Sequence, residues 1–333
     1  MRLPKFEYME PRSLKEASKT LALDPKGSVL LAGGTDLLVQ MKQRLIQPHR
    51  IINLKTLPRL SSISEGKEGI RIGALTSLHD IASSPLLIRS YPSLVQSAEA
   101  VGAYAHQVMG TLAGNLCQGN RCRFYNQSAF WRGVRPACIK AGGRVCHVVS
   151  ARPAGGRKPG ECYSAYCGDI APVLIALSAQ IHVVGPDKER TLPLRKLYTH
   201  KGKKPLSLKK GEILKAISIP SPTGTTLYLK WRLRDSIEFP MISLAVHLDK
   251  NGEGKIRRAK IVFSGAGPGP VEAPGVEKML VGADLNDPLI KKASDLISKE
   301  ISPMRTSTVS PAYKRKMAGI LLSQALERMM GTK

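Results

Sequence analysis

The stretch SVLLAGGTDLLVQMKQRLI, residues 28–46, decides how the first part of this chain folds. Its opening apolar run, 28–32, predicts a buried strand, and the apolar spacing of 37–46 predicts an amphipathic helix. Between them lies the turn Gly33-Gly34-Thr35-Asp36, and a second apolar run, RIINL (50–54), follows the helix. This order predicts a strand–turn–helix–strand unit in which glycines make the turn.

A second glycine turn, GTLAGNL (110–116), contains the same residue types. Glycine lets backbone N–H groups approach an oxyanion closely, and threonine or asparagine side chains add further donors. The first turn also opens a helix, whose N-terminal amides and dipole favour a phosphate. The two turns could therefore straddle a pyrophosphate. Neither turn has the G-x-G-x-x-G or G-x-x-x-x-G-K-[ST] pattern, so the fingerprint of a Rossmann or P-loop site is missing.

The rest of the pattern predicts a cofactor-binding half made of two subdomains and a smaller α+β domain after it. Pro-rich IPSPTG (219–224) indicates the boundary, and the runs beyond it alternate like antiparallel strands, with a hairpin turn at 249–255. The tail from Pro288 to Met330 has helical spacing. We therefore expect a first domain over 1–215, with subdomains over about 1–57 and 58–215, and a second domain over 216–333.

The 333-residue chain has 51 Lys and Arg against 25 Asp and Glu, a net charge of 51 − 25 = +26. Its 42% hydrophobic content is that of a globular protein, and six cysteines are too few for a disulfide-stapled mini-protein. No run approaches the ~20 apolar residues of a membrane span. The first residues lack the apolar core of a secretory signal, so we expect a cytoplasmic protein with no membrane contact.

The positive charge suggests nucleic acid as a partner, but other features speak against it. Aromatic residues make up only 5% of the chain, no recognised nucleic-acid motif is present and most basic residues are dispersed. We therefore expect no nucleic-acid partner. A basic zinc-containing nucleic-acid-binding protein is kept as an alternative of another class.

All six cysteines lie between Cys117 and Cys167, with the spacing C-x4-C-x15-C-x7-C-x15-C-x4-C. In a cytoplasmic chain such clustering indicates a metal or redox centre, although free cysteines also pack well in cores. The segment from Ala100 to Gly160 contains many Arg and Lys but no Asp or Glu, and 151–161 reads as a surface excursion. A second basic run, 201–215, reads as a solvated loop.

Four thiolates suit either zinc or an iron–sulfur cluster. The outer four cysteines form two C-x4-C pairs, which would resemble the arms of a zinc site. The inner choice gives one ligand per loop segment, as a loop wrapped around a 4Fe–4S cluster would. Nearby Arg and Lys stabilise the extra electron of an anionic cluster, so the basic surroundings favour the cluster. A structural zinc scaffold without redox activity stays open as an alternative.

The chain resembles the FAD-binding subunit of the molybdenum hydroxylases, the family of xanthine dehydrogenase, carbon monoxide dehydrogenase and aldehyde oxidoreductase. The resemblance implies an α+β fold, in which a two-subdomain FAD-binding domain of the vanillyl-alcohol-oxidase/PCMH type precedes a smaller C-terminal domain of the CO dehydrogenase flavoprotein type. It covers nearly the whole chain, through AGGTDLLVQMK (32–42), GTLAGNL (110–116), GDIAPVLIALSA (168–179), EILKAISIP (212–220), YLKWRLRDSIEFPMISLAV (228–246) and TSTVSPAYKRKMA (306–318).

The resemblance also implies where FAD binds. Asp169 would bind a polar edge of the cofactor, Leu214 would lie against the isoalloxazine and Lys230 would reach the flavin ring. Taken alone, Asp169 reads as a helix cap and Lys230 as a solvated strand residue. Two segments would cradle the pyrophosphate and ribityl chain, and their residues are Leu31, Ala32, Gly33, Gly34, Thr35, Asp36, Leu37 and Leu38, with Gly110, Thr111, Ala113, Gly114 and Asn115.

Within that family, residues 115–149 look most like the β subunit of 4-hydroxybenzoyl-CoA reductase. That subunit has a 4Fe–4S cluster in an inserted loop, which would cover about 117–163 here. The metal ligands implied by the match are Cys122, Cys138, Cys146 and Cys162, with Cys167 competing for the fourth place.

The resemblance implies an oxidoreductase subunit that transfers electrons while substrate chemistry takes place in a partner. The partners would be a molybdopterin-containing large subunit and a 2Fe–2S small subunit, in a dimer of heterotrimers with ferredoxin as electron donor. An open alternative is an FAD/4Fe–4S subunit of an aldehyde oxidoreductase or other molybdenum hydroxylase with outward electron flow. The basic residues that would form a docking face for ferredoxin are Arg121, Arg123, Arg132, Arg135 and Lys140.

Overall fold

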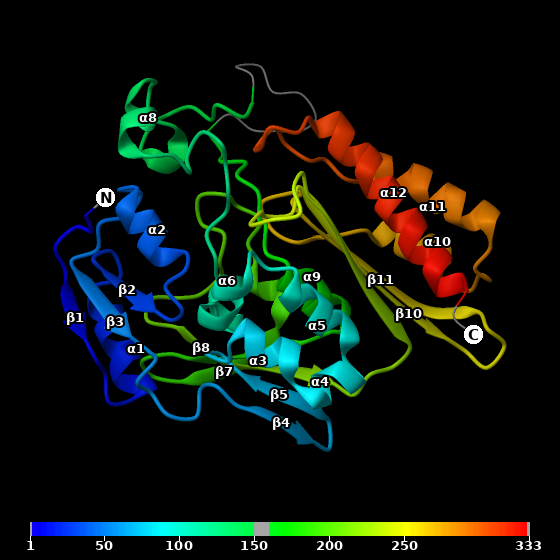
Figure 1. Ribbon diagram of the computed structural model, residues 1–333, viewed down its shortest axis with the longest axis horizontal. Helices are drawn as coiled ribbons and strands as arrows, with labels where there is room; N and C mark the ends of the chain where they lie inside the picture. The colour runs from blue at the N-terminus through cyan, green and yellow to red at the C-terminus, as the bar shows by residue number, and fades with distance from the viewer. Residues whose placement is uncertain (1, 150–159, 332–333) are drawn as a thin grey trace.

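The computed structural model describes residues 2–149 and 160–331 and contains three β-sheets with helices packed around them (Figure 1). The expected α+β class is confirmed, because two of the three sheets are antiparallel and the helices form separate layers. Within the described ranges, no helix is both long and apolar enough to cross a membrane. Most of the surface excursion expected at 151–161 lies outside the described residues.

The first sheet is small and parallel, with the strand order β1-β3-β2. The expected strand–turn–helix–strand unit is confirmed, although its helix ends earlier than predicted, just before Arg44 adopts a left-handed φ of 56°. The sequence pattern missed the first strand, which is only three residues long. The elements are β1 (Glu7–Met9), α1 (Leu14–Leu23), β2 (Ser28–Leu31), α2 (Leu37–Lys42) and β3 (Arg50–Asn53).

The second sheet has five antiparallel strands in the order β4-β5-β8-β6-β7. Strand β8 comes late in the chain but pairs with β5 and β6, so the segment that contains the cysteines is a long excursion of the chain between strands of this sheet. The elements are β4 (Ile63–Gly66), β5 (Gly69–Gly73), α3 (Leu78–Ser83), α4 (Pro85–Ser90), α5 (Pro92–Glu99), α6 (Tyr104–Met109), α7 (Leu112–Leu116), α9 (Ile170–Ala176), β6 (Gln180–Val184), β7 (Glu189–Pro193), the 3-10 turn η2 (Leu194–Leu197) and β8 (Ile213–Pro220).

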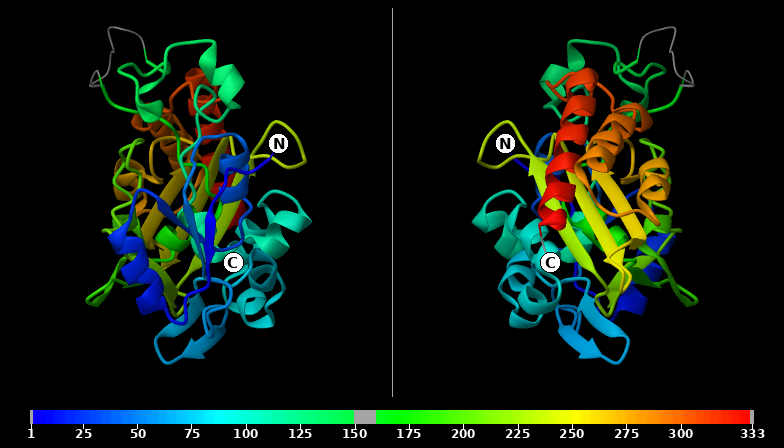
Figure 2. Two further views of the ribbon diagram at one scale, coloured as in Figure 1. Left: turned by 90° about the vertical axis from the view of Figure 1, so that its left-hand side faces the viewer. Right: turned by 90° about the vertical axis from the view of Figure 1, so that its right-hand side faces the viewer.

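The described part of the cysteine loop, 117–149 and 160–163, lies at one end of the molecule, opposite the hairpin β4–β5 (Figures 1 and 2). Its regular elements are the short helix α8 (Ala129–Gly133) and the 3-10 turn η1 (Ile139–Ala141). Arg121 and Ala165 tie its ends together through two backbone hydrogen bonds of 2.7 and 2.9 Å. The loop is therefore fastened to the body of the domain at the point where it begins and ends.

The third sheet is antiparallel with the order β12-β11-β10-β9, as the alternating pattern predicts. Helices α11 and α12 lie side by side on one of its faces (Figure 2), and the buried helix α9 packs against β10 and β11. The second domain therefore shares a core with the first. Its elements are β9 (Thr225–Trp231), β10 (Ile242–Lys250), β11 (Ile256–Ser264), β12 (Val271–Glu272), α10 (Pro274–Leu280), α11 (Asp287–Glu300) and α12 (Pro311–Met330).

Candidate cofactor site

The two glycine turns meet and line one cavity of about 420 Å³. A Cβ atom placed on Gly33 would lie 1.9 Å from the carbonyl oxygen of Met109 and 3.0 Å from the Cα of Gly110, so only glycine permits this approach. Gly34 has a φ of 76°, which turns the chain into α2. The pairing that the sequence suggested for the two turns is therefore present in the fold.

Most residues expected in the cradle line this cavity, but some do not. Leu31 and Leu38 pack behind the turn against Gly34. Ala113 packs against the core of the first domain, and Leu214 of β8 belongs to the same buried core; neither residue lines the cavity. The expected residues that line the cavity are Ala32, Gly33, Gly34, Thr35, Asp36, Leu37, Gly110, Thr111, Gly114, Asn115 and Asp169.

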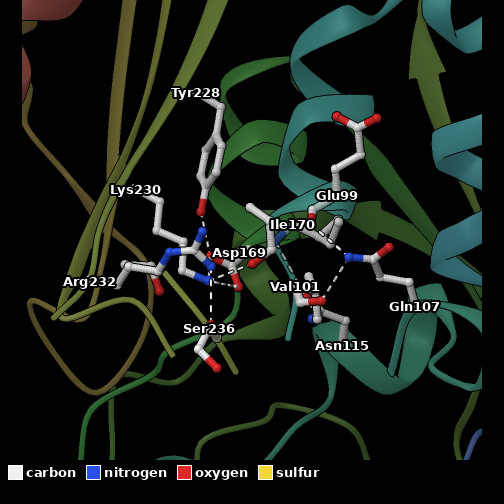
Figure 3. Close-up of polar contacts among 12 residues, drawn as sticks. Glu99, Val101, Gln107, Asn115, Asp169, Ile170, Tyr228, Lys230, Arg232 and Ser236 are labelled. Atoms are coloured by element: carbon white, nitrogen blue, oxygen red, sulfur yellow. Dashed lines mark hydrogen bonds and ion pairs between the residues drawn. The ribbon is translucent and has the colours of Figure 1, made fainter. Parts of the chain in front are cut away.

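Asp169 lies at the start of α9 in a buried polar network (Figure 3). Its carboxylate makes no capping bond; instead the Asn115 side chain accepts the Ile170 N–H (3.4 Å). The carboxylate accepts a hydrogen bond from the Tyr228 hydroxyl, and its Oδ1 lies 3.2 Å from Nζ of Lys230. Asp169 therefore does not act as a helix cap through its side chain, and Lys230 is not solvated, because both side chains are buried.

Burial raises the pKa of Asp169 to about 6, because desolvation outweighs the attraction of Lys230 and the hydrogen bond from Tyr228. Nζ of Lys230 also donates to the carbonyl oxygen of Ala100 (2.6 Å), which holds the ammonium group in place. The cavity wall therefore contains a carboxyl group that titrates near neutrality beside a fixed cation.

Two walls of the cavity come from segments that sequence reasoning missed. One is the turn at Val101 and Gly102, held by the Gln107 amide, which donates to the carbonyl oxygens of Glu99 (2.7 Å) and Val101 (3.2 Å) (Figure 3). The other is the β9–β10 connection, whose residues 237–239 reach the cavity from the second domain. Residues 237–239 belong to the stretch 228–246 that carries the resemblance, but nothing in either segment marks it as a cavity wall, and the tertiary fold brings both to the turns.

Arg121 joins the cavity to the cysteine loop. Its guanidinium forms an ion pair with Asp36 of the first glycine turn and lies 4.5 Å from the centre of the Phe239 ring. The Asp36 carboxylate also accepts a hydrogen bond from the Gln40 amide (2.8 Å). This ion pair neutralises a carboxylate that would otherwise repel a pyrophosphate bound between the turns.

The cavity fits a polar cofactor. Several buried nitrogen atoms in its wall have no hydrogen-bond partner within the described residues: Nδ1 of His106, Nε2 of Gln118 and Nε of Arg121. A buried polar atom without a partner costs roughly 1–3 kcal/mol, which a bound ligand with acceptor oxygens would recover. The glycine approach and these nitrogen atoms together suit a nucleotide cofactor with a pyrophosphate.

The cysteines separate into two groups. Burial raises the pKa of the Cys122 thiol to about 11, and the nearby Cys146 and Cys162 add to the rise. Cys138 and Cys162 act in the same way on the pKa of Tyr125, which burial also raises. The influence of Cys146 and Cys162 on Cys122, and of Cys138 and Cys162 on Tyr125, indicates that these four cysteines belong to one part of the loop.

Cys167 and Cys117 lie elsewhere, in the wall of the cofactor cavity. Burial raises the pKa of Cys167, and the charged groups that modify it are Lys314, Arg121, Asp169 and Lys230, none of which is a cysteine. Cys167 thus lines the cofactor cavity, whereas Cys162 is half-buried at the end of the cysteine loop, where its thiol donates a hydrogen bond to Oγ of Ser164 (3.4 Å).

A second cavity, of about 560 Å³, opens in the cysteine loop and is lined by Cys138, Tyr125 and Lys140. Among the described residues, no three His, Cys, Asp or Glu side chains lie close enough to hold a single metal ion. Ligands of a 4Fe–4S cluster are spaced more widely, because each one binds a different iron at a corner of the cube. Of the four cysteines expected to bind metal, only Cys138 lines this cavity.

Most side chains of the basic sheath of the cysteine loop make contacts within the chain. The sheath consists of Arg121, Arg123, Arg132, Arg135 and Lys140. Arg121 is held by Asp36, and Lys140 donates to the carbonyl oxygen of Asn120 (3.1 Å) and lies over the Tyr125 ring. Arg132 donates to backbone carbonyl oxygens on both sides of the α2–loop contact, among them that of Arg44 (2.9 Å). Only Arg123 and Arg135 of the expected docking face are exposed.

Two family descriptions match this chain. Residues 4–222 match the FAD binding domain in molybdopterin dehydrogenase. Residues 228–329 match the CO dehydrogenase flavoprotein C-terminal domain. The cavity lies in the first of these regions, with part of its wall supplied by the second.

Relatives and solved structures agree with these matches. The chain is 26% identical to the glyceraldehyde dehydrogenase medium chain of Sulfolobus acidocaldarius, over 98% of this chain and 99% of the relative. It is 29% identical to the aldehyde oxidoreductase FAD-binding subunit PaoB of Escherichia coli, over 75% of this chain and 80% of the relative. Reconstituted CO dehydrogenase from Oligotropha carboxidovorans matches with a TM-score of 0.80 and 26% identity, over 100% of both chains. The expected two-domain fold is confirmed.

The contact between the glycine turns gives a direct test of the cavity as the FAD site. Gly33→Ala places a methyl group against the Met109 carbonyl oxygen, so the turns must separate. We expect FAD affinity to fall roughly tenfold or more, since about 1.4 kcal/mol is a factor of ten. The matched control, Gly252→Ala, has no atom within 4 Å of the new Cβ and should bind FAD like the wild type. Quenching of flavin fluorescence measures both, and equal affinities would contradict the assignment.

Proposed function

This chain belongs to the FAD-binding family of the molybdopterin dehydrogenases, and we propose that it relays electrons as the flavin subunit of a molybdenum-containing 4-hydroxybenzoyl-CoA reductase. The observation that carries the proposal is the junction at Arg121. This residue lines the cofactor cavity, pairs with Asp36 and is followed directly by Cys122 of the cysteine loop. Two redox sites would thus share one wall.

The FAD site would be held by the two glycine turns, with the Asp169–Lys230 pair in its wall. FAD exchanges one or two electrons, which suits a junction between one-electron carriers. The turns supply backbone N–H groups and keep other atoms out of the space that the pyrophosphate needs. Lys230 is held by its ion pair with Asp169 and by its hydrogen bond to the Ala100 carbonyl oxygen, and Tyr228 donates to the same carboxylate.

The 4Fe–4S site would be held by Cys122, Cys138, Cys146 and Cys162. Two observations support this set: a cavity lined by Cys138 opens in the cysteine loop, and Cys167 lines the other cavity. The raised pKa of Cys122 means that the thiol keeps its proton until metal replaces it. Lys140 would place a positive charge beside the thiolates.

The remaining parts of the proposal are the partners. We propose a molybdopterin-containing large subunit, a 2Fe–2S small subunit and ferredoxin as electron donor, in a dimer of heterotrimers. Electrons would then run toward the molybdenum centre, where the phenolic hydroxyl is removed. A CoA thioester substrate and a ferredoxin donor both imply a cytoplasmic complex.

A second candidate is the FAD subunit of an aldehyde oxidoreductase, with electrons running outward. It is favoured by the relatives named glyceraldehyde dehydrogenase and aldehyde oxidoreductase. The two candidates share the FAD site and differ in the partner's substrate. In both candidates the substrate would bind to the partner subunit, and this chain would not contact it.

The ligand set is tested by comparing two cysteine variants. Anoxically purified wild-type chain should contain about four iron atoms and one FAD. Cys162→Ala should lose most of its iron and the visible absorbance of the cluster, because it removes one of four ligands. Cys167→Ala should keep its iron, because this thiol faces the cofactor cavity. Iron loss from Cys167→Ala alone, or zinc in place of iron, would reject the assignment.

The substrate is tested with the complex that copurifies with this chain. Given reduced ferredoxin, the complex should convert 4-hydroxybenzoyl-CoA to benzoyl-CoA. Chromatography of the thioesters measures this conversion. The same preparation should not oxidise aldehydes with an artificial electron acceptor. Aldehyde oxidation without thioester reduction would contradict the assignment to a 4-hydroxybenzoyl-CoA reductase and support the aldehyde oxidoreductase instead.

A further inference from the structure

The second basic run forms a surface loop with a concentrated positive charge. We call residues 195–210 the lysine loop; it runs from η2 toward β8. Its sequence, RKLYTHKGKKPLSLKK, contains no Asp or Glu. Its exposed cationic residues are Arg195, Lys196, Lys201, Lys203, Lys204, Lys209 and Lys210.

The loop is a fixed frame rather than a loose solvated segment. Thr199 donates its N–H to the Pro205 carbonyl oxygen (2.9 Å), and Lys204 donates to that of Lys201 (3.1 Å), which closes the tip. The buried Tyr198 hydroxyl donates to the Leu116 carbonyl oxygen (3.1 Å) and anchors the loop to the helix after the second glycine turn. The lysines at the tip are therefore presented in a defined place.

The cationic side chains of the lysine loop are not neutralised by carboxylates of the described residues. In the described ranges, no carboxylate forms an ion pair with any of its cationic side chains. The acidic residue that follows the loop, Glu212, accepts hydrogen bonds from Nε and Nη2 of Arg190, both at 2.7 Å. This differs from the sheath of the cysteine loop, where Arg121, Arg132 and Lys140 are bound internally.

The tip of the lysine loop lies directly on the segment that contains Cys162. The Gly202 N–H donates to the Cys162 carbonyl oxygen (3.2 Å), and a Cβ atom on Gly202 would lie 2.3 Å from that oxygen. The Cys162 thiol donates to Oγ of Ser164 (3.4 Å), which donates to the Gly202 carbonyl oxygen (3.2 Å). Two hydrogen bonds thus connect the lysine loop to the thiol.

We propose that the lysine loop is the docking surface for a small acidic electron-carrier protein, which delivers one electron through the Cys162 segment. The inference rests on the proposed function, because it needs a redox centre at Cys162. The reduced carrier loses one electron and the centre gains one, with no bond or proton transferred. The free lysines supply the long-range attraction that steers an acidic partner, and the tight Gly202 contact brings that partner near the centre.

A nucleic acid would be drawn to the same charge but is less well matched. Single-stranded nucleic acid needs aromatic faces on which bases stack, and Tyr198, the one aromatic residue of the lysine loop, is 5% exposed. Binding a nucleic acid would not require the lysine loop to lie beside Cys162. An acidic protein that exchanges electrons accounts for both the charge and its place.

The test compares two double charge reversals in the anoxically purified complex. Lys203→Glu/Lys204→Glu changes the tip of the lysine loop, and Lys291→Glu/Lys292→Glu makes the same change of charge on the exposed side of α11. Stopped-flow absorbance follows electron transfer from a reduced acidic ferredoxin. At low salt the first variant should react roughly tenfold more slowly than wild type, and the second within about twofold. The difference should shrink as salt rises, because screening weakens steering.

Iron content and reduction by photoreduced deazaflavin, a small neutral donor, are measured in the same samples. Both should be the same in all three proteins, which shows that the redox centre itself is intact. Iron-replete variants with equal ferredoxin rates would overturn the docking surface alone. A wild-type complex whose iron is fully accounted for by the 2Fe–2S small subunit, with none in this chain, would overturn the proposed function and this inference with it. Loss of oligonucleotide binding in the first variant, with an unchanged ferredoxin rate, would also overturn it in favour of nucleic acid.

Discussion

The ion pair between Arg121 and Asp36 is the interaction on which the arrangement of the sites depends. Arg121 belongs to the start of the cysteine loop, Asp36 to the first glycine turn, and Phe239, which lies against the guanidinium, to the second domain. Three parts of the chain that are far apart in sequence thus meet at one side chain. A charge-assisted hydrogen bond is roughly twice as strong as a neutral one, and both partners here are largely shielded from water. The position of the cysteine loop relative to the cofactor cavity follows from this contact.

Much of the fold could be predicted from local patterns. The glycine turn after the apolar run 28–32 and the alternating strands beyond Pro220 are present in the structure. The helical tail expected from Pro288 to Met330 is instead two helices, α11 and α12, because residues 301–310 between them are not helical. Strand β1 was missed because three partly exposed residues give no pattern. Helix α2 is shorter than its apolar spacing suggests, because the chain turns left-handed at Arg44, where the sequence shows no glycine.

The site was predictable where a motif determines the backbone and unpredictable where the tertiary fold determines it. The glycine at position 33 predicts that another part of the backbone approaches closely, and in the structure the Met109 carbonyl oxygen occupies the place of a Cβ atom. The partnership of Asp169 with Lys230 and Tyr228 joins a helix start to a strand of another domain, and no spacing in the sequence encodes it. Leu214, which was expected against the flavin, lies in the core of the first domain and does not line the cavity, and a register shift between β6 and β8 interrupts the alternation at this point. The order of the cysteines likewise left the choice between Cys162 and Cys167 open, whereas their surroundings in the structure differ clearly.

The central claim is that the glycine turns and the cysteine loop form two adjacent redox sites within one chain. Diffraction from crystals of the anoxically purified, FAD-loaded chain at the iron absorption edge tests this most directly. The account predicts one compact group of iron peaks among Cys122, Cys138, Cys146 and Cys162, with FAD density between the two glycine turns on the other side of Arg121. An absence of iron peaks, a single zinc peak, or iron bound at Cys167 would contradict it.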